Sequence, residues 1–212
     1  ILSGMAVGMD EIAAQATNES NPWAVVVPGY GGEFGASAIA RMLFGDFSPS
    51  GRLAYTVYKE PWAGATPMTD MALQAGQGRT YKWLKGAPTF AFGEGISWST
   101  FRLALQKLPQ AQHGYQIAVT NTGNTSASEV VLVFAKVVSL QQPSELQAAL
   151  PNKQLCDFAR TPVLAPGATH TLRFSIDEED LALTGWDGRR VVLPGSYALT
   201  FSGSNAKVHA DL

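Results

Sequence analysis

The fold of the second half of the chain is decided by the segment Leu193-Pro194-Gly195-Ser196-Tyr197-Ala198-Leu199-Thr200-Phe201. After its Pro-Gly turn signal, large apolar residues occupy every second position, which predicts a strand with one buried face. The same period of two recurs in three further segments, marked by Phe101, Leu103 and Leu105, by Tyr115, Ile117 and Val119, and by Leu172, Phe174 and Ile176. With their intervening turn signals, these segments predict about seven strands over roughly 110 residues, as in a β-sandwich.

The first part of the chain has a different pattern. Apolar residues at spacings of three and four predict an amphipathic helix over residues 5–17. The unbroken run Trp23–Val27 is typical of a strand buried on both faces of a parallel sheet, so Trp23 is expected in the core. A second helix is predicted over Glu33–Phe44, with Glu33 in its first turn and Gly45 as its left-handed cap. Helix, strand and helix together indicate an α/β layer.

Glycine and proline interrupt every candidate element between these two parts. We therefore predict an incomplete α/β layer over residues 1–57, an extended interdomain connector over 58–97, and an all-β, immunoglobulin-like sandwich over 98–212. A helical period competes with the strands only around Ser144–Leu150. The opening Ile1-Leu2-Ser3-Gly4 is typical of the end of a buried strand, so the chain is expected to start inside a domain.

Composition excludes several classes of function. Fifteen basic residues against 17 acidic ones give a formal net charge of −2, which argues against a nucleic-acid partner or an anionic membrane surface. No apolar run approaches the length of a transmembrane span. The single cysteine, Cys156, excludes an internal disulfide, and no Cys/His spacing is typical of a zinc site, so no metal is predicted.

Several ordered motifs resemble known proteins. Five in the first half are similar to the signatures of glycoside hydrolase family 3: Pro28-Gly29, Leu43-Phe44-Gly45-Asp46, Pro49-Ser50-Gly51-Arg52-Leu53, Gly78-Arg79-Thr80-Tyr81, and Phe92-Gly93 with Gly95 and Ser97. The second half resembles the fibronectin type III-like domain of that family at Val119–Gly123, Lys153–Leu155, Leu164–Gly167 and Leu193–Tyr197. The stretch Pro67–Met71 before Gly78-Arg79-Thr80-Tyr81 looks more like the β-xylosidase and arabinofuranosidase branch than the β-glucosidase branch.

This resemblance implies an enzyme of which the chain is the carboxyl-terminal portion. In the family, a preceding barrel supplies an aspartate nucleophile, and an earlier loop of the α/β domain supplies a glutamate acid/base. Neither motif matches this sequence, so no catalytic residue is expected here and the missing barrel and α/β portion are the expected partner. The resemblance further implies a cofactor-independent, retaining, exo-acting enzyme on oligo- or aryl-β-glycosides in a secreted, periplasmic or endomembrane compartment.

The sequence leaves alternatives for the sugar substrate and for whether the chain is part of an enzyme, a separate module or a processed subunit. A β-xylosidase is the leading prediction and a β-glucosidase of the same family is the second. A stand-alone carbohydrate-binding module is a third prediction, since the five tryptophans would supply a stacking surface for sugars. A processed subunit that stays bound to its barrel is a fourth.

A few residues are candidates for substrate proximity. Tyr30 and Glu33 follow the predicted strand at its carboxyl end, where α/β sheets bind ligands, although a first-turn carboxylate also suits the helix dipole. Trp62 and Trp83 lie in the predicted connector and would stack on a sugar, or else pack between domains. Asp46, Asp70 and Glu94 are the remaining carboxylates considered, and a turn role is favoured for Asp46.

Two sequons occur in the sequence, Asn18-Glu19-Ser20 and Asn124-Thr125-Ser126. Asn18 and Asn124 are therefore candidate N-glycosylation sites if the protein passes through a eukaryotic secretory route.

Overall fold

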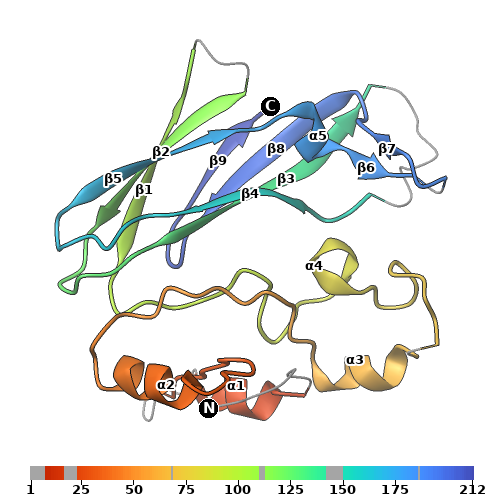
Figure 1. The fold of residues 1–212 in the computed structure, drawn as a ribbon. Coiled ribbons are helices and arrows are strands. Elements are labelled where there is room, and N and C mark those ends of the chain that lie inside the picture. The colour runs from red at the N-terminus through yellow and green to blue at the C-terminus, as the bar shows by residue number, and fades with distance from the viewer. Residues whose placement is uncertain (1–7, 17–22, 68, 110–112, 142–149, 186) are drawn as a thin grey trace. The chain divides into compact units, whose positions relative to one another are not determined.

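The structure is a computed structural model that describes residues 8–16, 23–67, 69–109, 113–141, 150–185 and 187–212 (Figure 1). The chain divides into two compact units. The first consists of Ile1–Phe47 and Arg52–Glu94, and the second of Ser48–Gly51 and Gly95–Leu212. The sequence-based bounds 1–57, 58–97 and 98–212 stay a prediction.

The first unit contains four helices within the described residues, two of which the sequence pattern indicates. They are α1 (Asp10–Ala16), α2 (Gly35–Leu43), α3 (Glu60–Ala65) and α4 (Thr80–Trp83). Helix α2 confirms the predicted second helix, with each end shifted by a residue or two. Of the first predicted helix, residues 8–16 are described, and α1 confirms it over Asp10–Ala16, whereas Gly8 and Met9 precede the helix. The range predicted as an extended connector thus contains two short helices, α3 and α4.

The end of α2 is a Schellman motif. Gly45 has a φ of +90°, which only glycine adopts without strain, and its N–H donates to the Met42 carbonyl at 3.1 Å. The Asp46 N–H donates to the Arg41 carbonyl at 2.9 Å. The Asp46 carboxylate also pairs with the Arg41 guanidinium across 2.9 Å, on the surface. The predicted cap is confirmed, and Asp46 has a structural role at the turn.

Two expectations for this unit are wrong. The segment Trp23–Val27 is not an assigned strand, because a strand is defined by ladder hydrogen bonds and no described segment pairs with it. Trp23 is 52% exposed instead of lying in the core. Glu33 does not stand in the first turn of α2, because the helix starts at Gly35 with Phe34 as its N-cap.

The long segment that closes the first unit is fixed by short backbone pairings. Val57 forms an antiparallel bridge with Phe90 and is fully buried. Nearby, the Leu53 N–H donates to the Glu94 carbonyl and the Gly93 N–H donates to the Leu53 carbonyl, both at 2.8 Å. The two ends of the range 53–94 are therefore held together.

The second unit is an antiparallel sandwich, as predicted. One sheet has the order β1-β2-β5 and the other has the order β4-β3-β8-β9, which gives seven strands in the two sheets within the described residues. Their bounds are β1 (Phe101–Lys107), β2 (Gly114–Asn121), β3 (Val130–Leu140), β4 (Gln154–Arg160), β5 (Thr169–Ser175), β8 (Gly195–Ser202) and β9 (Lys207–Asp211). A one-turn helix α5 (Glu178–Leu181) and a small hairpin of β6 (Leu183–Thr184) and β7 (Arg190–Val191) complete the unit.

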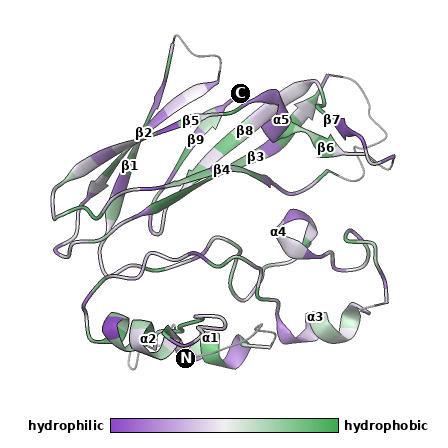
Figure 2. Ribbon diagram, in the orientation of Figure 1, coloured by the Kyte–Doolittle hydropathy of each residue, from purple (hydrophilic) through white to green (hydrophobic). Residues whose placement is uncertain are grey.

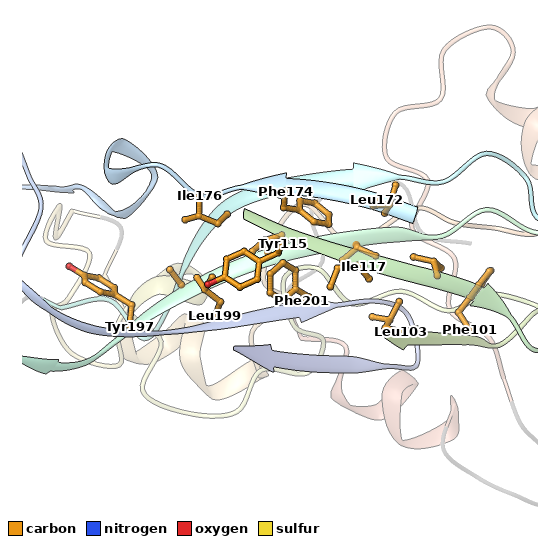
Figure 3. Packing of buried hydrophobic residues seen from close by; sticks show 14 of the residues in the cluster. Phe101, Leu103, Tyr115, Ile117, Leu172, Phe174, Ile176, Tyr197, Leu199 and Phe201 are labelled. Carbon is orange, nitrogen blue, oxygen red and sulfur yellow. The ribbon is translucent and has the colours of Figure 1, made fainter. Parts of the chain in front are cut away.

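The core lies between the two sheets. Tyr115, Ile117 and Leu199 are fully buried, as is Phe201, because successive side chains of a strand alternate between its faces (Figure 3). The Phe201 ring packs against Tyr115 at a centroid distance of 5.4 Å and against Phe174 at 5.6 Å. Burial of Ile117, Leu199 and Phe201 stabilises the fold by about 1.5–3 kcal/mol for each side chain. Hydrophobic colouring recurs along β3 and β8 (Figure 2).

The predicted helical alternative over Ser144–Leu150 falls almost entirely on residues outside those described. No helix among the described residues is long and apolar enough to cross a membrane.

Candidate functional site

Trp62, one of the two predicted stacking residues, is engaged on one face and at its edge. Its ring stacks on Tyr58 with a centroid distance of 3.8 Å and an interplanar angle of 10°. Its indole Nε1–H donates to the Gly78 carbonyl at 3.0 Å. Trp62 is half-buried, so its arrangement fits internal packing better than an open sugar platform. A role near substrate stays a prediction.

Trp83, the second stacking candidate, is the last residue of α4 and follows Gly78 by five positions. The turn at Gly78 passes so close to Trp83 that a Cβ on residue 78 would lie 1.9 Å from the Trp83 carbonyl oxygen. Gly78 also has a φ of +72°, so both its conformation and its surroundings require glycine. Gly78 thus contacts the indole N–H of Trp62 through its carbonyl and lies beside the backbone of Trp83.

The motif Gly78-Arg79-Thr80-Tyr81 contains a residue with a strained backbone. Thr80 has a φ of +59°, and a β-branched residue in this region is an outlier. Its N–H donates to the Tyr58 hydroxyl at 2.7 Å, and its own hydroxyl accepts from the Lys82 N–H at 3.2 Å. Tyr58 thus holds both Thr80 and Trp62. The only sequence signal for Tyr58 was an aromatic residue four positions before another.

Tyr30 and Glu33 lie elsewhere in the first unit, on the loop that precedes α2. Tyr30 is 89% exposed, and the Glu33 side chain is exposed as well. Phe34 and Phe44, at the two ends of α2, are 75% and 88% exposed. The chain thus presents several apolar side chains around α2 that nothing within the described residues buries. The predicted substrate contacts of Tyr30 and Glu33 remain predictions.

The remaining carboxylates of this unit bind backbone groups. Asp70 accepts from the Ala72 N–H at 3.0 Å, and Glu94 accepts from the Ala91 N–H at 2.7 Å. Both are therefore explained by the local turns that they close. A retaining glycosidase needs two carboxylates about 5 Å apart across the reacting bond. Asp46, Asp70 and Glu94 each hold a structural partner instead.

Asp10 forms a clasp between distant segments. One carboxylate oxygen accepts from the Glu60 N–H at 2.9 Å, and the other accepts from the Thr89 hydroxyl. These two donors, the Thr89 hydroxyl first, hold the pKa of Asp10 below its usual value. Asp10 joins α1 to the start of α3 and to the segment that pairs with Val57. Sequence reasoning had no signal for this clasp.

Polar groups buried in the second unit are structural. Asn121 is fully buried, and its side-chain amide takes part in four hydrogen bonds. Glu129 is also buried, and its carboxylate accepts from the Val130 N–H at 3.1 Å and from the N–H and hydroxyl of Ser204 at 3.0 and 2.5 Å. Among the described residues, no three His, Cys, Asp or Glu side chains gather as a metal site would require.

Comparison with known protein families accounts for most of the sequence. Residues 1–98 match the glycosyl hydrolase family 3 C-terminal domain, and residues 129–205 match the fibronectin type III-like domain. The two matches follow each other along the chain in the order that the motifs indicated.

Three of the relatives that this chain resembles are named as xylosidases. A probable exo-1,4-beta-xylosidase, xlnD, of Aspergillus terreus is 30% identical over 90% of this chain and 27% of its own length. The exo-1,4-beta-xylosidase bxlB of Emericella nidulans is 34% identical over 83% of this chain and 25% of its own length. Beta-D-xylosidase 1 of Arabidopsis thaliana is 30% identical over 87% of this chain and 28% of its own length. The chain spans about a quarter of the length of these relatives.

Solved structures are similar over the same range. A GH3 exo-beta-xylosidase, XlnD, in complex with a xylobiose aziridine activity-based probe matches all of this chain and 30% of its own, with a TM-score of 0.79 and 26% identity. The beta-D-glucoside glucohydrolase of Trichoderma reesei matches 98% of this chain and 32% of its own, with a TM-score of 0.73 and 23% identity, which is evidence for the fold alone.

Proposed function

The chain belongs to glycosyl hydrolase family 3, of which it carries the C-terminal domain and a fibronectin type III-like domain, and on this premise we propose that its protein is an exo-acting, retaining β-xylosidase. The proposal rests chiefly on one observation, the 30–34% identity to relatives named as xylosidases over 83–90% of the chain. The stretch Pro67–Met71, shortly before Gly78-Arg79-Thr80-Tyr81, resembles the same branch of the family and supports the proposal.

We propose that this chain supplies no catalytic carboxylate and that the rest of the enzyme provides both. Hydrolysis with retention requires a nucleophile and an acid/base that flank one glycosidic bond. Asp10, Asp46, Asp70 and Glu94 are each engaged with backbone or side-chain partners in their own turns or clasps. The expected partner of the chain is therefore the preceding barrel and α/β portion of the same protein.

The exposed apolar residues around α2 support such a partner. Tyr30, Phe34 and Phe44 are 75–89% exposed, and single domains seldom leave large apolar side chains clustered in water. The segment Trp23–Val27 has the composition of a buried strand but no ladder partner among the described residues, and we propose that an element outside them supplies one. Docking of the preceding portion would bury both features.

Two other functions are less well supported. A β-glucosidase of the same family has the support of solved structures that share the fold. A stand-alone sugar-binding module would need an open aromatic platform. Trp62, a leading candidate for it, is half-buried against Tyr58, which argues against that function.

The proposal is tested by steady-state kinetics of the full-length protein on two aryl glycosides that differ only in the sugar. We expect kcat/KM for the aryl β-xyloside to exceed that for the aryl β-glucoside by at least about tenfold, a difference of about 1.4 kcal/mol in transition-state binding. A reversed preference would favour the β-glucosidase. Absence of turnover of either glycoside by a folded full-length protein would contradict the proposal altogether.

A further inference from the structure

The turn between β2 and β3 carries the sequon Asn124-Thr125-Ser126 on the surface of the second unit. The side chains of Asn124 and Ser126 are exposed. The Asn124 Oδ1 accepts a hydrogen bond from the Thr125 hydroxyl at 3.3 Å. The Asn124 Nδ2, which is the atom that would take a sugar, has no hydrogen-bond partner among the described residues.

The turn is held in place from inside the sandwich. The Asn121 Nδ2 donates to the carbonyls of Thr125 and Leu164, both at 2.8 Å. The Asn121 Oδ1 accepts from the Gly123 N–H at 3.0 Å. These bonds fix the backbone on both sides of Asn124, so a group attached to Asn124 projects outward and displaces no buried contact.

The neighbouring surface suits a glycan. The exposed hydroxyls of Thr100 and Thr122 lie 3.0 Å apart, and those of Thr120 and Thr169 lie 2.8 Å apart. Uncharged hydroxyl groups of this kind hydrogen-bond to water and to sugars alike. An attached oligosaccharide at Asn124 would therefore replace hydration without burying a charge.

We propose that Asn124 is an acceptor for an N-linked oligosaccharide. In the transfer, the Asn124 Nδ2 forms a bond to C1 of the first sugar of a lipid pyrophosphate-linked oligosaccharide and loses a proton. The bond from C1 to the pyrophosphate oxygen breaks, and the lipid pyrophosphate leaves with the electron pair. Ser126 supplies the hydroxyl that the acceptor tripeptide requires. Because transfer occurs on the nascent chain, exposure of Asn124 matters for tolerance of the glycan in the folded protein.

The test uses the full chain, secreted from a glycosylating yeast with Asn18→Gln so that only one sequon remains. We expect intact mass to show one oligosaccharide, peptide mapping to place it on residue 124, and peptide:N-glycosidase to remove it and leave Asp at that position. Ser126→Thr should keep the glycan, whereas Ser126→Ala and Asn124→Gln should lose it.

The result does not depend on how well the Ser126 and Asn124 variants fold, because peptide mapping of the secreted Asn18→Gln chain by itself shows whether Asn124 carries a glycan. A folded, secreted chain whose Asn124 peptide is unmodified would overturn the proposal. So would a glycan that persists in Ser126→Ala.

Discussion

Replacing Asn121 with alanine should unfold the sandwich at a much lower temperature. The Asn121 side chain is fully buried and forms four hydrogen bonds, with the Ser99 hydroxyl at 2.6 Å, the Gly123 N–H at 3.0 Å, and the carbonyls of Thr125 and Leu164 at 2.8 Å each. A net loss of about 1 kcal/mol for each bond gives a destabilisation of about 4 kcal/mol. Partners left buried without a bond add to this loss.

The assay is thermal unfolding of the chain, followed by the strand signal in circular dichroism. For a domain of this size, about 4 kcal/mol corresponds to a fall in Tm of about 10 °C or more. Asn121→Asp keeps the shape but sets a carboxylate against two carbonyl oxygens, so we expect a comparable loss at neutral pH. The exposed neighbour Thr122→Ala is the matched control and should change stability by less than about 1 kcal/mol. A Tm for Asn121→Ala within about 3 °C of the parent chain would refute this reasoning.

Three further predictions concern the first unit. The amide proton of Glu60 should titrate with Asp10 by NMR below pH 3.8, because the lowered pKa keeps the clasp in place above the unfolded pKa and releases it only as pH falls through the folded one. Gly78→Ala should destabilise the unit by about 2 kcal/mol or more in thermal unfolding, because its Cβ would lie 1.9 Å from the Trp83 carbonyl. Changing Phe34 and Phe44 to serine should lower ANS fluorescence of the isolated chain, because the two rings are 75% and 88% exposed.

Each of these predictions has a control or an outcome that would contradict it. A titration midpoint of the Glu60 amide at or above 3.8 would show that the Asp10 clasp does not form. Gly29→Ala is the control for Gly78, since Gly29 also has a positive φ but has open space around it, and it should cost only about 1 kcal/mol. Val163→Ser removes a single exposed apolar side chain from the second unit, and equal ANS loss there would contradict a patch around α2.

The sandwich was predictable because each of its sheets has one face in the core. Tyr115, Ile117 and Val119 are all fully buried, and these large apolar residues stand at every second position, so the period of two is present in the sequence. The buried polar groups were not visible in this way. Asn121 lies within the motif Val119–Gly123, which does not indicate a buried amide. Glu129 precedes the apolar run of β3, where composition alone gives no reason for a buried carboxylate.

The first unit was less predictable, because its contacts join residues far apart in sequence. The Asp10 clasp spans 50 positions to Glu60 and 79 to Thr89, and no local pattern indicates it. The segment Trp23–Val27 has the composition of a buried strand, yet strand formation depends on a neighbour that supplies ladder hydrogen bonds. The sequence pattern gave Trp62 as a candidate residue but gave no reason to choose Tyr58, whose hydroxyl and ring contact Thr80 and Trp62.

The central claim, that this chain is part of a retaining β-xylosidase but lacks its nucleophile, is tested most directly by covalent labelling with a xylose-configured aziridine probe. Such a probe forms a bond with the carboxylate nucleophile of a retaining enzyme. We expect intact mass to show no adduct on the 212-residue chain alone. In the full-length protein, we expect one adduct, which peptide mapping places outside residues 1–212. An adduct on a carboxylate of the chain itself, such as Glu33 or Asp70, would contradict the claim.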